Sequence, residues 1–270
     1  MSLSAHATEQ AGLWGTDPQG WAEFAEPHNE PLFHAVLDAA GVGPGTRLTD
    51  LGCGSGRALV LARGRGATVT GVDATEPLLA IARHRLPGAK LLLGELDDLP
   101  LADNEADAVI GINAFQFAAD PRAALREAAR VLAPGGRLVA GLFAAPERSE
   151  STVLHRALST LVPAPIHVPY ALSAPGALES ALQAAGLRIR DRGETVCFWA
   201  YASVADTIRG LLASAGGALA VSGGGRRAAA ALITEAVRPF VAADGTVRMR
   251  NVFRWVSAHP VTDIAGNSLS

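Results

Sequence analysis

Two acidic residues and three glycines in this chain have the types and spacing of a ligand-binding loop. Asp50 lies in a short β-prone run, and Gly52, Gly54 and Gly56 follow it at alternate positions before a helical pattern begins. Glycine lets the backbone turn sharply and brings its N–H groups close to a ligand. The helix directs its positive end at the same place. Asp73 ends the next β-prone run. This spacing predicts a site for a nucleotide-like cofactor.

The position of Asp73 indicates what such a cofactor contains. A carboxylate at the end of the second strand accepts hydrogen bonds from ribose hydroxyls, and each charged bond contributes about 1.5–3 kcal/mol. The glycine spacing departs from the dinucleotide fingerprint G-x-G-x-x-G, and Asp50 precedes the first glycine by two residues. Both differences disfavour a nicotinamide-dependent oxidoreductase, which stays as an alternative. A loop that serves only tight packing, with Asp50 as a cap, is the second alternative.

Strand and helix signals alternate from Thr46 to Phe143 and would position this loop. Predicted strands cover 46–51, 67–72, 90–93, 107–112 and 137–143, and predicted helices cover 57–63, 78–85 and 122–132. This alternation is typical of a Rossmann-like, doubly wound α/β fold with a mostly parallel sheet. Right-handed crossovers place the ligand crevice at the carboxyl ends of the strands. The glycine loop and Asp73 are therefore expected to meet there.

Outside this core the predicted helices and strands no longer alternate regularly. Asn29 reads as the N-cap of a helix with Pro31 in its first turn. Beyond Phe143, helices are predicted over 152–161, 175–185, 204–215 and 226–241, and strands over 187–200 and, antiparallel, 246–257. The predicted division of the chain is a helical lid at 1–45, a cofactor-binding core at 46–143, lid or substrate insertions at 144–172 and 202–245, the rest of the core at 173–201 and 246–258, and a tail at 259–270.

The composition excludes several function classes. The chain has 270 residues, 49% of them hydrophobic, and a net charge of −3. It can bury a full core, and its charge gives no case for nucleic acid or an anionic membrane as partner. Cys53 and Cys197 lack metal-ligand spacing, so no metal site or disulfide scaffold is expected. The start has no signal-peptide pattern, and no apolar run has membrane-spanning length. We expect a cytoplasmic protein.

Five motifs between residues 46 and 143 resemble class I S-adenosylmethionine-dependent methyltransferases. The resemblance is to the small-molecule branch, methyltransferase type 11, typified by enzymes of ubiquinone and menaquinone biosynthesis. The motifs are DLGCGSG at 50–56, GVDAT at 71–75, GELDDLPL at 94–101, DAVIGIN at 107–113 and VLAPGGR at 131–137. The resemblance implies S-adenosyl-L-methionine as cofactor, S-adenosyl-L-homocysteine as product, and methylation of a small metabolite of natural-product type.

The resemblance also implies roles for single residues. Gly52 and Gly54 would approach the methionine part of the cofactor, Asp73 would hold the ribose, and Glu95 would accept from the adenine amino group. Glu95 stands where the family usually has Asp. Cys53 is interpreted as a small loop residue, because no basic group is placed to form a thiolate. The implied cofactor-binding residues are Asp50, Gly52, Cys53, Gly54, Asp73, Ala74, Leu78, Glu95, Leu96 and Asn113.

The acceptor side rests on residues outside the motifs. A sulfonium donor is already activated, so the protein mainly supplies proximity and orientation, worth up to about 7–11 kcal/mol. A general base is needed only if the nucleophile must lose a proton. Candidates for such a base are His28, His155 and His167, while Gln116 would orient a ligand because an amide does not titrate. The candidate pocket residues, which favour an apolar or aromatic acceptor, are Trp14, Trp21, Phe24, Phe115, Phe117 and Tyr170.

Several questions about the acceptor side of the site stay open. The aromatic residues would equally pack a lid against the core or form a homodimer interface. A protein of the same fold would bind the same cofactor as a cyclase, lyase or regulator, because only the pocket would differ. The acceptor atom is open among O, N, C and S.

Overall fold

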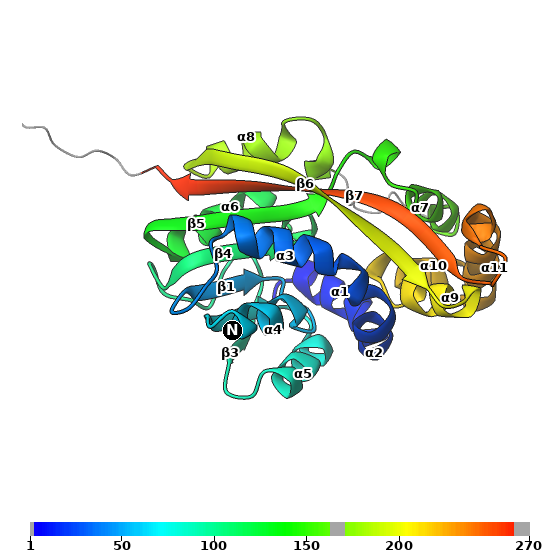
Figure 1. Ribbon diagram of the computed structural model, residues 1–270. Coiled ribbons are helices and arrows are strands. Elements are labelled where there is room, and N and C mark those ends of the chain that lie inside the picture. Colours follow the sequence, from blue (N-terminus) through cyan, green and yellow to red (C-terminus); the bar gives the residue numbers. More distant parts are fainter. Residues whose placement is uncertain (1–2, 163–170, 262–270) are drawn as a thin grey trace, which may run out of the picture.

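A seven-stranded mixed sheet forms the centre of the molecule. The computed structural model describes residues 3–162 and 171–261 (Figure 1). The strand order is β3-β2-β1-β4-β5-β7-β6. Neighbours from β3 to β5 are parallel, whereas β7 is antiparallel to both β5 and β6. This confirms the predicted Rossmann-like fold with an antiparallel last strand. The strands are β1 (Arg47–Leu51), β2 (Thr68–Asp73), β3 (Lys90–Leu93), β4 (Ala106–Ile112), β5 (Leu132–Phe143), β6 (Leu187–Tyr201) and β7 (Val247–Pro260).

Helices cover both faces of the sheet. α3 (Glu30–Ala39), α4 (Arg57–Gly64) and α5 (Glu76–Arg85) bury their apolar residues on one face. α6 (Pro121–Val131) and α8 (Ala177–Ala184) do so on the other. In α6 the buried side chains recur at helical spacing, which gives one apolar stripe toward the sheet; they are Ala124, Leu125, Ala128 and Val131. Two apolar layers therefore hold the strands from both sides.

Four helices form a third hydrophobic cluster, which we call the helical cap. They are α7 (Thr152–Ser159), α9 (Val204–Leu212), α10 (Ala215–Gly224) and α11 (Arg226–Val237). Ile233 and Val237 of α11 pack with Val247 and Met249 of β7 in this cluster. Figure 1 shows β6 and β7 running past the other strands to reach these helices. The two long strands therefore join the helical cap to the sheet.

The N-terminal segment consists of short helices that lead into α3. They are α1 (Ala5–Trp14), α2 (Pro18–Gly20), the π-helical turn η1 (Trp21–Ala25) and the 3₁₀ turn η2 (Glu26–Asn29). α1 contacts α10, and η1 contacts α9. The N-terminal segment and the helical cap therefore lie side by side, as Figure 1 also shows.

One helix and the limits of two strands differ clearly from the predictions. α10 was not predicted, because Gly216, Gly217 and two further glycines lower helix propensity. The glycine at 217 has a packing reason, since a Cβ there would lie 2.2 Å from the carbonyl oxygen of Leu211. β5 begins at Leu132, ahead of the predicted 137. β7 continues through Pro260, so the first residues of the predicted tail pair with β6.

Short 3₁₀ turns complete the described chain. They are η3 (Phe115–Phe117), η4 (Pro146–Arg148), η5 (Ala171–Ser173) and η6 (Arg238–Phe240). Among the described residues no single helix is long and apolar enough to cross a membrane. α9 and α10 reach that length and apolarity only as a pair, and the pair is bent by 93°.

Candidate functional site

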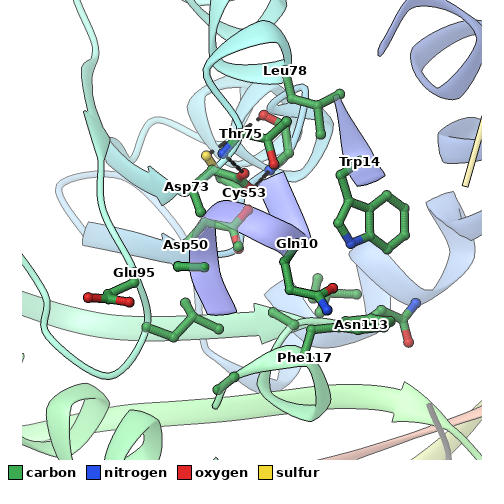
Figure 2. A pocket seen from close by; sticks show the side chains of 18 of the residues that line it. Gln10, Trp14, Asp50, Cys53, Asp73, Thr75, Leu78, Glu95, Asn113 and Phe117 are labelled. Carbon is green, nitrogen blue, oxygen red and sulfur yellow. Dashed lines mark hydrogen bonds between the residues drawn. The ribbon is translucent and has the colours of Figure 1, made fainter. Parts of the chain in front are cut away.

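A cavity of about 160 Å³ opens at the carboxyl ends of β1, β2 and β4 (Figure 2). We call it the cofactor cavity. Every residue that the motifs suggested for cofactor binding lines it: Asp50, Gly52, Cys53, Gly54, Asp73, Ala74, Leu78, Glu95, Leu96 and Asn113. These residues come from four separate stretches of the chain. Parallel pairing brings them together, because the strands end at one edge of the sheet.

The glycine loop after β1 requires the absence of a side chain. Gly52 has φ +75° and donates its backbone N–H to the carbonyl of Val72, with N and O 2.8 Å apart. A Cβ at this position would lie 2.6 Å from the Cβ of Ala114. Real Cβ atoms do not approach so closely, so only glycine fits both the dihedral and the space. The loop therefore passes tightly under the chain that follows β4.

Asp73 is held by the backbone at the end of β2. Its Oδ2 accepts from the N–H of Gly54, and its Oδ1 accepts from the N–H of Thr75, both at 2.8 Å (Figure 2). A carboxylate has about four acceptor positions, so both oxygens keep capacity for further hydrogen bonds. The carboxylate thus fixes the glycine loop and still presents acceptors to the cofactor cavity.

Buried acids line the cofactor cavity. Burial, together with the nearby charges of Asp73 and Glu26, raises the pKa of Asp50 to about 8. Burial also raises the pKa of Asp73, although the N–H groups of Gly54 and Thr75 oppose this. Glu26 is paired with Arg85, with Oε2 and Nη1 2.6 Å apart. A cationic ligand would favour the charged form of these acids.

Cys53 behaves as a buried thiol. Burial raises its pKa well above the ordinary value, and Asp73 and Asp50 add to the rise. A thiol in this state is a poor nucleophile. The structure therefore agrees with its interpretation as a small loop residue.

Helix α1 covers one side of the cofactor cavity. Ser4, its N-cap, donates its hydroxyl to Oε2 of Glu95. The Nε2 atom of His6 lies 2.9 Å from the carbonyl oxygen of Phe117. Gln10 of the same helix lines the cavity. The motifs carried no information on these contacts, although Ser4 before an alanine-rich helix is a recognisable N-cap signal.

A second cavity, of about 740 Å³, adjoins the first. We call it the large cavity. The two share the wall residues Gln10, Trp14, Trp21, Asn29, Asn113 and Phe117. Trp14 makes edge contacts with Trp21 and Phe117, with ring centroids 4.8 and 5.5 Å apart. The helical cap completes the large cavity through Leu154, Leu158, Leu211 and Leu219.

Some of the residues predicted for an acceptor pocket line these two cavities. Trp14, Trp21 and Phe117 line both cavities, and Gln116 and His155 line the large one. Burial lowers the pKa of His155 to about 4, so its imidazole is neutral near neutral pH. It faces the ring of Phe143 at a centroid distance of 6.0 Å. The predictions for His167 and Tyr170 fall outside the described residues.

Three predicted residues lie outside both cavities, which corrects the sequence analysis. Phe115 is 1% exposed in the core, because Gly111 leaves room for its ring. Phe24 lies under the guanidinium of Arg209, 5.7 Å from its ring centroid. His28 has its Nε2 atom 2.8 Å from the carbonyl oxygen of Ala200, and its ring packs against Tyr201. All three serve packing between elements in this structure.

Asn29 lies in the wall of both cavities, although its sequence context predicts only the N-cap of a helix. It precedes α3, but its side chain makes no capping hydrogen bond. The residue is 6% exposed and lines both cavities. No local pattern distinguishes this Asn from an ordinary N-cap, so only the three-dimensional position of η2 revealed it.

Within residues 3–162 and 171–261, no group of three or more His, Cys, Asp or Glu residues is placed to hold a metal ion.

The fold and the site together define an α/β domain with a ligand cavity at the carboxyl ends of its strands, and the comparison with protein families identifies the class of this domain. Residues 49–140 match the methyltransferase domain family. Demethylmenaquinone methyltransferase from Renibacterium salmoninarum is 34% identical over 111 residues, which cover 41% of this chain and 47% of that protein. Residues 49–140 therefore form a methyltransferase domain, and S-adenosyl-L-methionine is the cofactor that such a domain implies.

Solved structures show the same fold over most of the chain. The [4+2]-cyclase SpnF has a TM-score of 0.55 at 21% identity, covering 86% of this chain and 81% of that one. Geranyl diphosphate C-methyltransferase from Streptomyces coelicolor has a TM-score of 0.56 at 16% identity, covering 97% and 100%. The chain spans about a third to a half of the length of the curated relatives it matches.

Proposed function

We propose that this protein transfers a methyl group from S-adenosylmethionine to a small, apolar or aromatic metabolite. The observation that carries the proposal is the large cavity, which shares Trp14, Trp21, Asn113 and Phe117 with the cofactor cavity. A second, mostly apolar cavity beside the cofactor is where an acceptor would bind. The family match of residues 49–140 supports the reaction class.

The cofactor cavity fits the chemical groups of this cofactor. The Asp73 carboxylate offers acceptors for ribose hydroxyls, and a bound cation would favour the charged forms of Asp50 and Asp73, whose pKa values are raised by burial. Glu95 and Leu96 line the same cavity and would contact the adenine. When bound, S-adenosylmethionine supplies a methyl group on a positively charged sulfur, which needs no further activation.

The work of the protein in this proposal is orientation and exclusion of water. The α1 helix would act as a lid, because Ser4 and His6 tie it to Glu95 and Phe117 across the cofactor cavity. The aromatic contacts of Trp14 with Trp21 and Phe117 give the shared wall a stiff, apolar surface. His155 would not serve as a base near neutral pH, because burial holds its pKa at about 4. The proposal therefore assigns no general base.

Cofactor binding is the first test. Asp73→Ala removes the ribose acceptors and the anchor of the glycine loop. Loss of one charged hydrogen bond costs about 1.5–3 kcal/mol, so calorimetry should show S-adenosylmethionine affinity reduced at least about tenfold. Asp107→Ala is the matched control, because its side chain pairs with Arg47 at the opposite end of the sheet. Equal affinity of the Asp73 variant and the wild type would refute the proposed site.

Turnover is the second test. The [4+2]-cyclase SpnF shares the fold, so a cyclase or lyase is the alternative activity on this scaffold. Incubation with candidate aromatic metabolites should form S-adenosylhomocysteine in step with a product heavier by one methyl group. Product formation without S-adenosylhomocysteine would favour the alternative.

A further inference from the structure

Three side-chain amides line the large cavity with a buried oxygen atom that has no hydrogen-bond partner among the described residues. They belong to Asn29, Asn113 and Gln116. The residues Asn29 and Gln116 are 6% and 2% exposed. Among the described residues, none provides a hydrogen bond to any of the three amide oxygens. Buried polar groups in folded proteins are nearly always paired. Three unpaired amide oxygens in the wall of one cavity therefore indicate a ligand that donates hydrogen bonds to them.

Each amide is held by a different element. Asn29 ends η2 and precedes α3. Asn113 follows β4 with φ +52°, a conformation that Asn tolerates, and its backbone N–H donates to Gly141. Gln116 belongs to η3, whose Phe115 is packed in the core. The three backbones are thus positioned by the fold and not by contacts among the amides.

The rest of the described wall of the large cavity is mostly apolar. Trp199 adds an indole N–H, and this donor also has no partner among the described residues. Ionisable side chains in the described wall are those of Glu147, His155, Arg156 and Tyr201, and burial raises the pKa of Tyr201 so that its hydroxyl is neutral. Glu147 and Arg156 are exposed. The buried polar groups at the cofactor side are therefore uncharged.

We propose that the acceptor is a neutral, hydroxyl-bearing molecule that donates hydrogen bonds to the unpaired amide oxygens of Asn29, Asn113 and Gln116. The inference rests on the proposed function and names the substrate class of the same site. A hydroxyl donates a hydrogen bond to an amide oxygen, whereas a carboxylate or a fully ionised phosphate has no hydrogen to donate and would be repelled by these oxygens. No described cationic side chain lies at this end of the wall, so the protein itself would leave such an anion without a charge partner. Asn29 and Asn113 line both cavities, so the polar head lies at the boundary with the cofactor.

Equilibrium dialysis of three matched probes tests this inference. The protein is loaded with S-adenosylhomocysteine and offered 2-naphthol, naphthalene and 2-naphthoate, which share a skeleton and differ in the polar group. We expect 2-naphthol to bind at least about tenfold more tightly than the other two, because its O–H pairs with a buried oxygen that otherwise costs about 1–3 kcal/mol when it is left unpaired. Equal affinities, tighter 2-naphthoate, or no binding of 2-naphthol would each overturn the inference.

Variants assign the selectivity to the amides. Gln116→Leu and Gln116→Met should each weaken 2-naphthol about tenfold and leave naphthalene unchanged. Gln183→Leu, an exposed amide on α8 outside both cavities, is the control. Unchanged 2-naphthol binding in both Gln116 variants would overturn the role of this residue. S-adenosylhomocysteine binding to the wild type is measured separately by calorimetry. Its absence would refute the proposed function, whereas its presence without probe selectivity would refute only this inference.

Discussion

At the scale of single residues, Asp50 lowers the stability of the folded protein at neutral pH and provides a charge that a cationic ligand would bind. Burial, with Asp73 and Glu26 nearby, raises its pKa from an ordinary value near 4 to about 8. An acid with a raised pKa binds its proton more tightly in the folded protein than in the unfolded chain. Its contribution to stability is therefore present below pH 4 and is lost as the pH rises toward 8. A cationic cofactor would recover part of that loss.

Asp50→Asn should flatten this pH dependence. The amide has nearly the same shape and does not titrate, so the free energy of unfolding should fall less between about pH 5 and pH 8 than in the wild type. Urea denaturation followed by circular dichroism measures both curves. Asp244→Asn is a control, because hydrogen bonds to Thr246 lower the pKa of that exposed carboxyl. Parallel curves for wild type and Asp50→Asn would contradict the prediction.

At the scale of elements, the loop between β1 and α4 depends on close packing as well as on dihedral angles. Gly52 and Gly45 have similar positive φ values, +75° and +80°. A Cβ at Gly52 would overlap Ala114, whereas a Cβ at Gly45 would meet nothing within 4 Å. The two glycines therefore separate the dihedral cost from the packing cost.

Gly45→Ala should cost only the penalty of a left-handed residue, about 1–2 kcal/mol. Gly52→Ala should cost this plus the overlap, about 1–3 kcal/mol more, and it should also weaken S-adenosylmethionine binding. Thermal unfolding and calorimetry on the two variants give the comparison. If both variants lost equal stability and both bound the cofactor normally, the close approach at Gly52 would be irrelevant.

At the scale of the whole molecule, β6 and β7 connect the sheet to the helical cap. Ile233 of α11 is fully buried in the third cluster. This cluster supports the wall of the large cavity through Leu154, Leu158 and Leu211. The cofactor cavity is lined by none of these residues. The helical cap should therefore affect the two cavities differently.

Ile233→Ala should destabilise the protein by about 2–5 kcal/mol, and Ile233→Val by about 0.5–1.5 kcal/mol. Binding of 2-naphthol should fall more than binding of S-adenosylhomocysteine, because the cavity wall loosens on one side only. Denaturation curves and the two binding assays report the three quantities. Equal loss of both ligands would show that the helical cap supports the cofactor cavity as strongly as the large one.

The predictions agree with the structure where a residue's position depends on its neighbours in the sequence. All ten suggested cofactor-wall residues line the cofactor cavity. α10 was missed because its glycine-rich sequence has low helix propensity, and packing against its neighbours in the cap compensates for this. Phe24, Phe115 and His28 were misplaced because an aromatic ring or imidazole has the same appearance in a core as in a pocket.

The sequence by itself determined the cofactor half of this protein. Glycine spacing and the acids at Asp50 and Asp73 act through short loops at strand ends, and parallel pairing brings those ends to one edge. The proposed acceptor site depends on the tertiary structure alone. The large cavity is built from α1, η2, η3 and the helical cap, which are distant in sequence. Polar residues such as Asn29 line this cavity because elements distant in sequence pack together there, and the residues next to them in the sequence do not predict that packing.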